Sequence, residues 1–414
     1  MKVPARRHWI PPGALIFAQV AHGVSWILLA IIAASAGVAV VNGAGLAWIH
    51  TVALGWLTMA ALGILIHVVP GFTDVRWLRE RAVRFTLLPF GAGIACFVAG
   101  WFLSPLVVLI GAMVMVVAFL GYYFIAVSTL RHASEAGKTE AAIGRALTIN
   151  LSFLLVVLLI GVVMAGALAG GRYSALLARL PAVHAELALY GWFTMLVYGV
   201  SARTLRPICG ALSRFRRMHV VVASSVLLGP ILLAIGIGVD IRSIAWLGAI
   251  VIGAGALCYA FDTLDIVRRA TVRHRPPQAF VVASVVWLTV ATLLGFGLLL
   301  GEPWASAYVF VMLIGWIGQM VNAHFLHIGV RLIATVIRGD DDETRPGALL
   351  DARLSWLAFA AMQSAITLCC YGLLVNAASA VGSGAAIGLI AWMALAANAI
   401  VAARRAWTSD EVPL

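Results

Sequence analysis

IHTVALGWLTMAALGILIHVVP (Ile49 to Pro70) carries a pattern that two later segments of the chain repeat. They are VHAELALYGWFTMLVYGVSARTLRP (Val183 to Pro207) and YVFVMLIGWIGQMVNAHFLHIGVR (Tyr308 to Arg331). Each is apolar over a length that can cross a bilayer as a helix, and each carries a Gly-Trp pair. A pattern that recurs at a spacing of about four such helices predicts a bundle built three times around a shared centre.

The composition is that of an integral membrane protein. Hydrophobic residues make up 63% of the 414 residues and charged residues 11%, and the mean hydropathy is +1.04. Such a chain is too apolar for a water-soluble fold. Apolar runs near the length that crosses a bilayer predict twelve transmembrane helices, at about residues 12–39, 45–68, 85–104, 106–130, 146–170, 181–202, 218–239, 243–266, 278–300, 305–336, 354–376 and 384–403.

We therefore expect an all-α polytopic membrane protein with one transmembrane domain over residues 1–414. Its three pseudo-repeats of four helices cover about residues 12–131, 146–268 and 278–405. Loop charges predict the orientation, because Lys and Arg near helix ends favour the cytoplasmic side. With the N-terminus inside, every Lys and Arg except Arg172, Arg179 and Arg242 falls on that side. Both termini should thus be cytoplasmic, in a membrane of the bacterial inner type.

The net charge of +12 does not indicate nucleic-acid binding. The basic residues are spread over many predicted loops on one side rather than gathered in one patch. Membrane topology accounts for them, so we expect the lipid bilayer as a partner and no nucleic acid.

Two histidines are expected near the outer boundary of the predicted bundle. The glycines of the Gly-Trp pairs, Gly55, Gly191 and Gly315, align the three stretches without gaps. The residues five positions before these glycines are His50, Glu186 and Phe310; the residues seven positions before are Trp48, His184 and Tyr308. His50 and His184 thus hold near-equivalent places on two helices that should face each other. Imidazoles across a bundle core can ligate haem iron axially, and Glu186 could orient one or bind a metal. The alternative is a simple polar packing layer.

A second level of polar residues is expected near the inner boundary. His67, Arg203 and His327 share one aligned position, and His324 lies on the same helix face as His327. At the rise of an α-helix this level is about 25 Å from the outer one. Histidines here could hold a second haem or a copper ion, and Arg203 could neutralise a haem propionate. Interfacial histidines facing water are the alternative reading.

The segment HTVALGWLTMAALGILIHVVP resembles the haem-copper oxidase subunit I superfamily, especially cbb-type oxidases and nitric-oxide reductases. Ligand helices of that family carry a His before an A-L-G-W-type run and end in Pro, which His50, Gly55, Trp56 and Pro70 match in order. Twelve helices in three groups of four also match the pseudo-threefold subunit I bundle. The resemblance implies a haem-binding membrane protein with His50 as an axial ligand.

The sequence is also similar to a reduced branch of that superfamily, the NnrS family of haem- and copper-containing proteins linked to nitric oxide resistance. The shared features are Trp48, His50, Pro70, Phe72 and Thr73, with H-A, T-M, G-V and R-T-L elements between His184 and Leu205. An oxygen-reducing centre is not expected. The chain has Glu186 where the sixth helix should supply a copper ligand, His219 alone on the seventh, and Tyr308 and Phe310 where the tenth should hold two histidines.

These patterns favour a membrane haem protein that serves electron transfer or nitric oxide and redox defence. We expect one haem b, or two if both levels bind one, and a redox partner protein; copper and a homo-oligomer stay open. If the chain is an enzyme, it should be a haem-dependent oxidoreductase rather than a proton-pumping oxygen reductase. The alternatives are a haem-free twelve-helix transporter or copper-handling protein, and a scaffold whose polar residues only set helix register.

Overall fold

The computed structural model describes residues 12–35, 43–172, 175–339 and 345–408. It is 90% helical, and the described part holds no strand. Twelve of its helices are long and apolar enough to cross a membrane, which confirms the predicted number and an all-α multi-pass architecture. Residues 36–39, at the end of the first predicted span, lie outside the described residues.

The first four spans use the first third of the chain. They are formed by α1 (Pro12–Ser35), the continuous helix α2 (Gly43–His50), η1 (Thr51–Thr58) and α3 (Met59–Thr73), then α4 (Glu80–Leu103) and α5 (Pro105–Leu130). A short helix, α6 (Ala133–Ala136), follows. The next four spans are α7 (Lys138–Ala169), the helix α8 (Ala175–Glu186), η2 (Leu187–Thr194) and α9 (Met195–Cys209), then α10 (Arg216–Gly238) and α11 (Arg242–Arg268).

The last four spans begin with α12 (Arg275–Leu300). The tenth is formed by α13 (Ala305–Phe310), η3 (Val311–Gly318), α14 (Gln319–His324), η4 (Phe325–Gly329) and α15 (Val330–Arg338). A short helix, α16 (Pro346–Leu349), precedes α17 (Ala352–Val375) and α18 (Ala378–Thr408). Several helices run past their apolar stretch, as α7 and α18 do, because backbone hydrogen bonds continue after the residues that lipid requires to be apolar.

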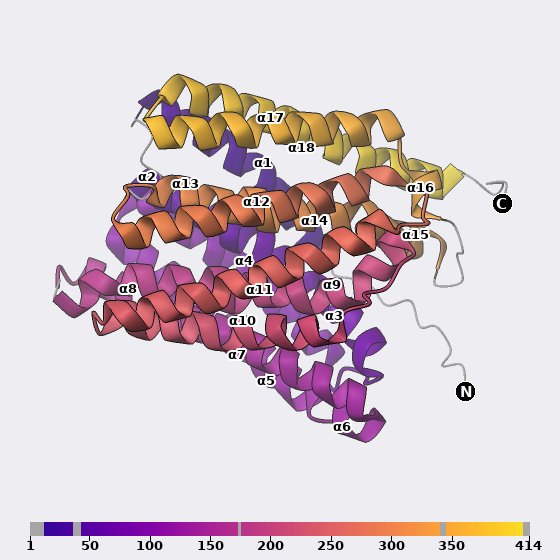
Figure 1. Cartoon of the computed structure of the whole chain (residues 1–414), viewed down its shortest axis with the longest axis horizontal. Helices are drawn as coiled ribbons and strands as arrows, with labels where there is room; N and C mark the ends of the chain where they lie inside the picture. The colour runs from indigo at the N-terminus through magenta and orange to yellow at the C-terminus, as the bar shows by residue number, and fades with distance from the viewer. Residues whose placement is uncertain (1–11, 36–42, 173–174, 340–344, 409–414) are drawn as a thin grey trace.

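The spans alternate in direction, so α1 begins and α18 ends at the same end of the bundle (Figure 1). We call this the basic end, because the arginine-bearing loops after α3, α9 and α11 lie there. The opposite end is where α2, α8 and α13 begin (Figure 1). The assignment of the basic end to the cytoplasm stays a prediction.

In each group of four, the third and fourth spans pack as a close hairpin: α4 with α5, α10 with α11, and α17 with α18. Glycines permit this approach. A Cβ on Gly111 would lie 2.4 Å from the backbone nitrogen of Phe97, and one on Gly248 would lie 2.4 Å from that of Leu233. Small residues at such interfaces let helix backbones approach closely inside a membrane.

The three helices that align in sequence also share a feature that the sequence did not predict. Each widens into eight residues of π-helix, η1, η2 or η3, with the Gly-Trp pair at its fifth and sixth positions. The glycines Gly55, Gly191 and Gly315 lie against the preceding helices α1, α7 and α12. A π-helix closes its hydrogen bonds over five residues instead of four, so it turns later side chains to a new direction.

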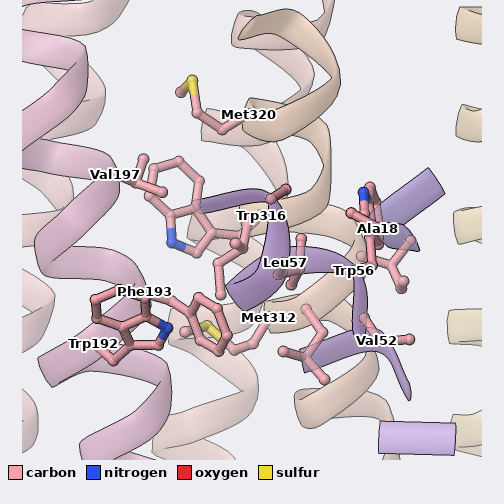
Figure 2. Close-up of a cluster of buried hydrophobic side chains, with 14 of the residues drawn as sticks. Ala18, Val52, Trp56, Leu57, Trp192, Phe193, Val197, Met312, Trp316 and Met320 are labelled. Atoms are coloured by element: carbon pink, nitrogen blue, oxygen red, sulfur yellow. The ribbon is translucent and has the colours of Figure 1, made fainter. Parts of the chain in front are cut away.

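The tryptophans of the three pairs lie in one cluster of buried side chains and are at most 1% exposed (Figure 2). Trp192 Nε1 donates a hydrogen bond of 3.1 Å to Thr58 Oγ1, and Trp316 Nε1 donates one of 3.1 Å to Thr194 Oγ1. Thr58 and Thr194 end their π segments. These contacts support the predicted alignment of the three helices, whereas the repeat layout of the whole chain stays a prediction.

The third junction differs because Gly318 stands where the other two have threonine. A Cβ on Gly318 would lie 2.9 Å from the Trp56 ring, so this ring occupies the place of a side chain. Trp56 instead stacks on His22 of α1, with ring centroids 3.5 Å apart and planes 4° from parallel.

Candidate functional site

Three side-chain pairs form a ring about two helical turns closer to the opposite end of the bundle than the tryptophans of the Gly-Trp pairs. In each pair, the residue five positions before one Gly-Trp glycine meets the residue seven positions before the next. The pairs are His50 with His184, Glu186 with Tyr308, and Phe310 with Trp48. The same geometric relationship thus brings together an imidazole pair at one junction, a carboxyl and a phenol at the second, and two aromatic rings at the third.

His50 and His184 come together as the sequence alignment predicts. Their ring centroids are 6.3 Å apart and their planes are inclined by 42°. His50 Nδ1 lies 2.7 Å from the carbonyl oxygen of Leu46, one turn earlier in α2. Since a carbonyl only accepts, Nδ1 carries the proton and Nε2 keeps a free lone pair. This tautomer is the one that a metal-binding imidazole adopts when its other nitrogen is held by a backbone carbonyl.

His184 offers a second nitrogen without a protein partner. Its Nδ1 is buried and makes no hydrogen bond to the described atoms. A Cβ at Gly161 would lie 3.5 Å from His184 Cε1, so α7 runs close beside this ring. An unpaired buried nitrogen costs free energy that a bound metal would recover.

Aromatic side chains of α4 surround the histidine pair. Phe97 packs edge-on against His50 with centroids 4.9 Å apart, and the Trp101 ring lies 6.5 Å away, tilted by 18°. Trp101 Nε1 is buried without a hydrogen-bond partner in the described part of the chain. It is therefore a free donor beside the pair, of the kind that a carboxylate such as a haem propionate accepts.

Glu186 does not join the two histidines. Its carboxylate oxygens lie 3.2 and 3.1 Å from the hydroxyl of Tyr308, which is also 3.3 Å from the hydroxyl of Tyr190. Glu186 is expected from the sequence to bind a metal or to orient an imidazole. In the structure it belongs instead to a hydrogen-bonded group with Tyr308 and Tyr190. Its distinct place follows from the ring of pairs, since Glu186 faces the third repeat helix and His184 faces the first.

The predicted inner level is not assembled into one site. His324 uses both ring nitrogens, with Nδ1 2.7 Å from the Met320 carbonyl oxygen and Nε2 2.6 Å from Thr204 Oγ1. The Arg203 guanidinium lies 5.9 Å from the Phe72 ring centroid. Within the described ranges, no three His, Cys, Asp or Glu side chains form a metal-binding group, so His67, His324 and His327 do not converge.

The residues that pattern reading missed are Tyr190, Tyr308 and Trp101. The comparison with ligand helices presents Tyr308 only as a residue in place of a histidine. The alignment already held the signal for it, because Tyr308 and His184 share one offset and must make equivalent contacts. Trp101 carried no such signal, since it lies on α4, outside the repeated helices.

The separation of the His50 and His184 rings can be compared with that of two imidazoles bound to one metal ion. A metal-imidazole bond is about 2 Å long, so two rings on opposite sides of one iron have centroids about 6 Å apart. The observed 6.3 Å agrees with that span. No protein-family model matches the chain, and no curated protein matches its sequence significantly.

Proposed function

We propose that the chain is a membrane haem protein that transfers electrons, with His50 and His184 as the two axial ligands of one haem b. The observation that carries the proposal is the 6.3 Å separation of two imidazoles that each keep a nitrogen for a metal. The resemblance of the second span to haem-copper oxidase ligand helices supports it. The proposal includes a bacterial-type inner membrane with the basic end in the cytoplasm.

Each neighbouring residue would have a defined part in such a site. The Leu46 carbonyl holds His50 in the ligating tautomer. Trp101 Nε1 is placed to donate to a propionate, and Phe97 supplies an apolar wall. When bound, the haem iron supplies one-electron chemistry at a potential set by its axial ligands and its burial.

The geometry favours electron transfer over the binding of nitric oxide. If His50 and His184 both held the haem iron, the protein would leave no position on it for a diatomic ligand. Nitric oxide chemistry requires one histidine to leave. The low-spin, six-coordinate spectrum expected for the bis-histidine site separates these two roles.

An optical spectrum of the purified chain tests the proposal. After expression with sufficient haem, we expect about one haem b per chain and a reduced spectrum of low-spin, six-coordinate iron. His50→Ala and His184→Ala should each remove most of the bound haem or convert it to a high-spin form. His132→Ala is the matched control, because this histidine lies in the loop after α5, away from the pair. Absence of haem, or an unchanged spectrum in both variants, refutes the proposal.

Copper is a second candidate occupant of the same pair. Phe97 packs edge-on against His50, and a single ion needs less space beside these rings than a porphyrin does. Imidazole is a good ligand for copper. Metal analysis distinguishes copper from haem. A copper site gives one copper and no haem per chain, and the copper should be lost when His50 or His184 is replaced.

The haem-free transporter receives no comparable support from the bundle centre. Carrier sites usually lie near mid-membrane between helices that open a path. Here Trp56, Trp192 and Trp316 fill that level and are almost fully buried (Figure 2).

A further inference from the structure

A polar pocket opens at the basic end between α9, α10 and α11, away from the histidine pair. Its cavity is about 40 Å³, measured as space open to the centre of a water-sized sphere. One water needs about 10–15 Å³ on this measure, so the pocket has room for an ion with a few waters. Its lining includes Ser201, Ser213, His219, Tyr259 and Asp262.

Asp262 is the charged group of this pocket that needs a partner. Its side chain is 11% exposed, and Ser213 donates a hydrogen bond of 2.6 Å to its Oδ1. The nearby Asp265 forms ion pairs with Arg214 and Arg269. Among the described side chains, the ion-pair partner of Asp262 within 4 Å is His219 alone. A buried carboxylate without a full cationic partner carries a desolvation cost that a bound cation would offset.

The distance between His219 and Asp262 suits a bridging metal better than a direct contact. His219 Nε2 lies 3.8 Å from Asp262 Oδ2, which is too long for a hydrogen bond. Nitrogen and oxygen ligands each bind a first-row metal at about 2.0–2.2 Å, so two of them stand about 3–4 Å apart across the ion. The His219 side chain is 46% exposed, so an ion can reach this side of the pocket from water.

We propose that this pocket binds a first-row divalent metal ion such as Zn²⁺ or Mn²⁺ between His219 Nε2 and Asp262 Oδ2. Imidazole with carboxylate, hydroxyl and water ligands is a donor set that such ions accept. No third His, Cys, Asp or Glu side chain of the described part joins the pair, so water would supply the remaining ligands. Arg206 also lines the pocket and opposes a cation, which limits the affinity.

The test is zinc binding to the full-length chain in detergent, measured by equilibrium dialysis and metal analysis. The background variant carries His50→Ala and His184→Ala, so that the histidine pair adds no zinc. We expect about one Zn²⁺ per chain in this background, which makes the outcome independent of the proposed haem site. Mn²⁺ followed by electron paramagnetic resonance is a second readout of the same ion position.

His219→Ala and Asp262→Asn should each weaken zinc binding by at least about tenfold, the loss seen when a metal site loses a supporting group. His132→Ala and Asp265→Asn are the matched controls and should leave the affinity unchanged. Because His219 is half exposed, its variant should fold even if Asp262→Asn does not. The proposal is overturned if the background variant binds no zinc at about 100 micromolar, which is ten times a Kd of about 10 micromolar, or if His219→Ala binds as tightly as its parent.

Discussion

Glu186 places its two carboxylate oxygens 3.2 and 3.1 Å from the hydroxyl of Tyr308, in the same relationship that brings His50 to His184. The helix carrying Glu186 thus offers one face to each neighbour, with His184 toward the first repeated helix and Glu186 toward the third. The side chains differ between the junctions, whereas the backbone arrangement is shared. Because the arrangement is shared, the side-chain pair of one junction should be able to replace that of another.

A second imidazole pair should add a second metal site. Glu186→His combined with Tyr308→His would place two imidazoles at the second junction, and we expect a second bound metal or haem per chain. Metal and haem analysis of the purified double variant checks this. Glu186→His alone is the control and should not add a site, because one imidazole lacks its partner. If the double variant binds no more than the wild type, the two junctions are not equivalent.

The indole-threonine bonds at the bundle centre should contribute to stability. Thr58→Val keeps the side-chain shape but leaves the buried Trp192 N–H without its acceptor, which should lower the free energy of unfolding by about 1–3 kcal/mol. Thr51→Val in the same helix is the control, because its hydroxyl donates only to the Ala47 carbonyl and no donor depends on it. Thermal unfolding in detergent compares the two, and an equal loss would contradict the predicted role of the bond.

The glycine before Trp192 should not tolerate a methyl group. A Cβ at Gly191 would lie 2.4 Å from the Phe153 ring on α7, so Gly191→Ala should cost about 1–3 kcal/mol through overpacking. Gly199, two turns further along the same helix, has no atom within 4 Å of its Cβ position. Gly199→Ala should therefore be neutral or stabilising by up to about 1 kcal/mol. Thermal unfolding of both variants measures the difference, and similar midpoints would argue against close α7 packing.

The cap of α17 should give stability a pH dependence. Asp351 accepts hydrogen bonds from the backbone N–H groups of Leu354, at 3.1 Å, and Arg353, at 2.8 Å. The hydrogen bond from Leu354 is the largest cause that lowers the pKa of Asp351 below its usual range. The hydrogen bond from Arg353 and the nearby Arg405 lower it further. A lowered pKa means that the contribution is full at neutral pH and is lost as the pH falls below about 4.

Asp351→Asn keeps a capping oxygen without a titrating charge. We expect the wild type to be the more stable at pH 7 and this advantage to shrink toward pH 3.5. Unfolding midpoints across that range check the prediction. A wild-type advantage that stays constant with pH would show that the charge of Asp351 contributes nothing.

Sequence reading located every span because a membrane makes a local demand. A helix in lipid must be apolar over a bilayer thickness and satisfies its own backbone, so no distant residue is needed to recognise it. The gapless alignment of Gly55, Gly191 and Gly315 likewise predicts that His50 and His184 hold near-equivalent helix positions, two residues apart in the alignment. Both results required only residue type and spacing.

The tertiary structure alone decided which side chains meet. Which neighbour a helical residue faces depends on the rotation of the helix about its axis. The π turns η1, η2 and η3 change that rotation, whereas apolar spacing in the sequence predicts a regular α-helix. In the folded chain Glu186 contacts Tyr308 and His324 contacts Thr204, and neither joins a metal cluster. The pocket of His219 and Asp262 likewise required α10 and α11 to be placed beside each other, since contacts between separate helices depend on packing rather than on local composition.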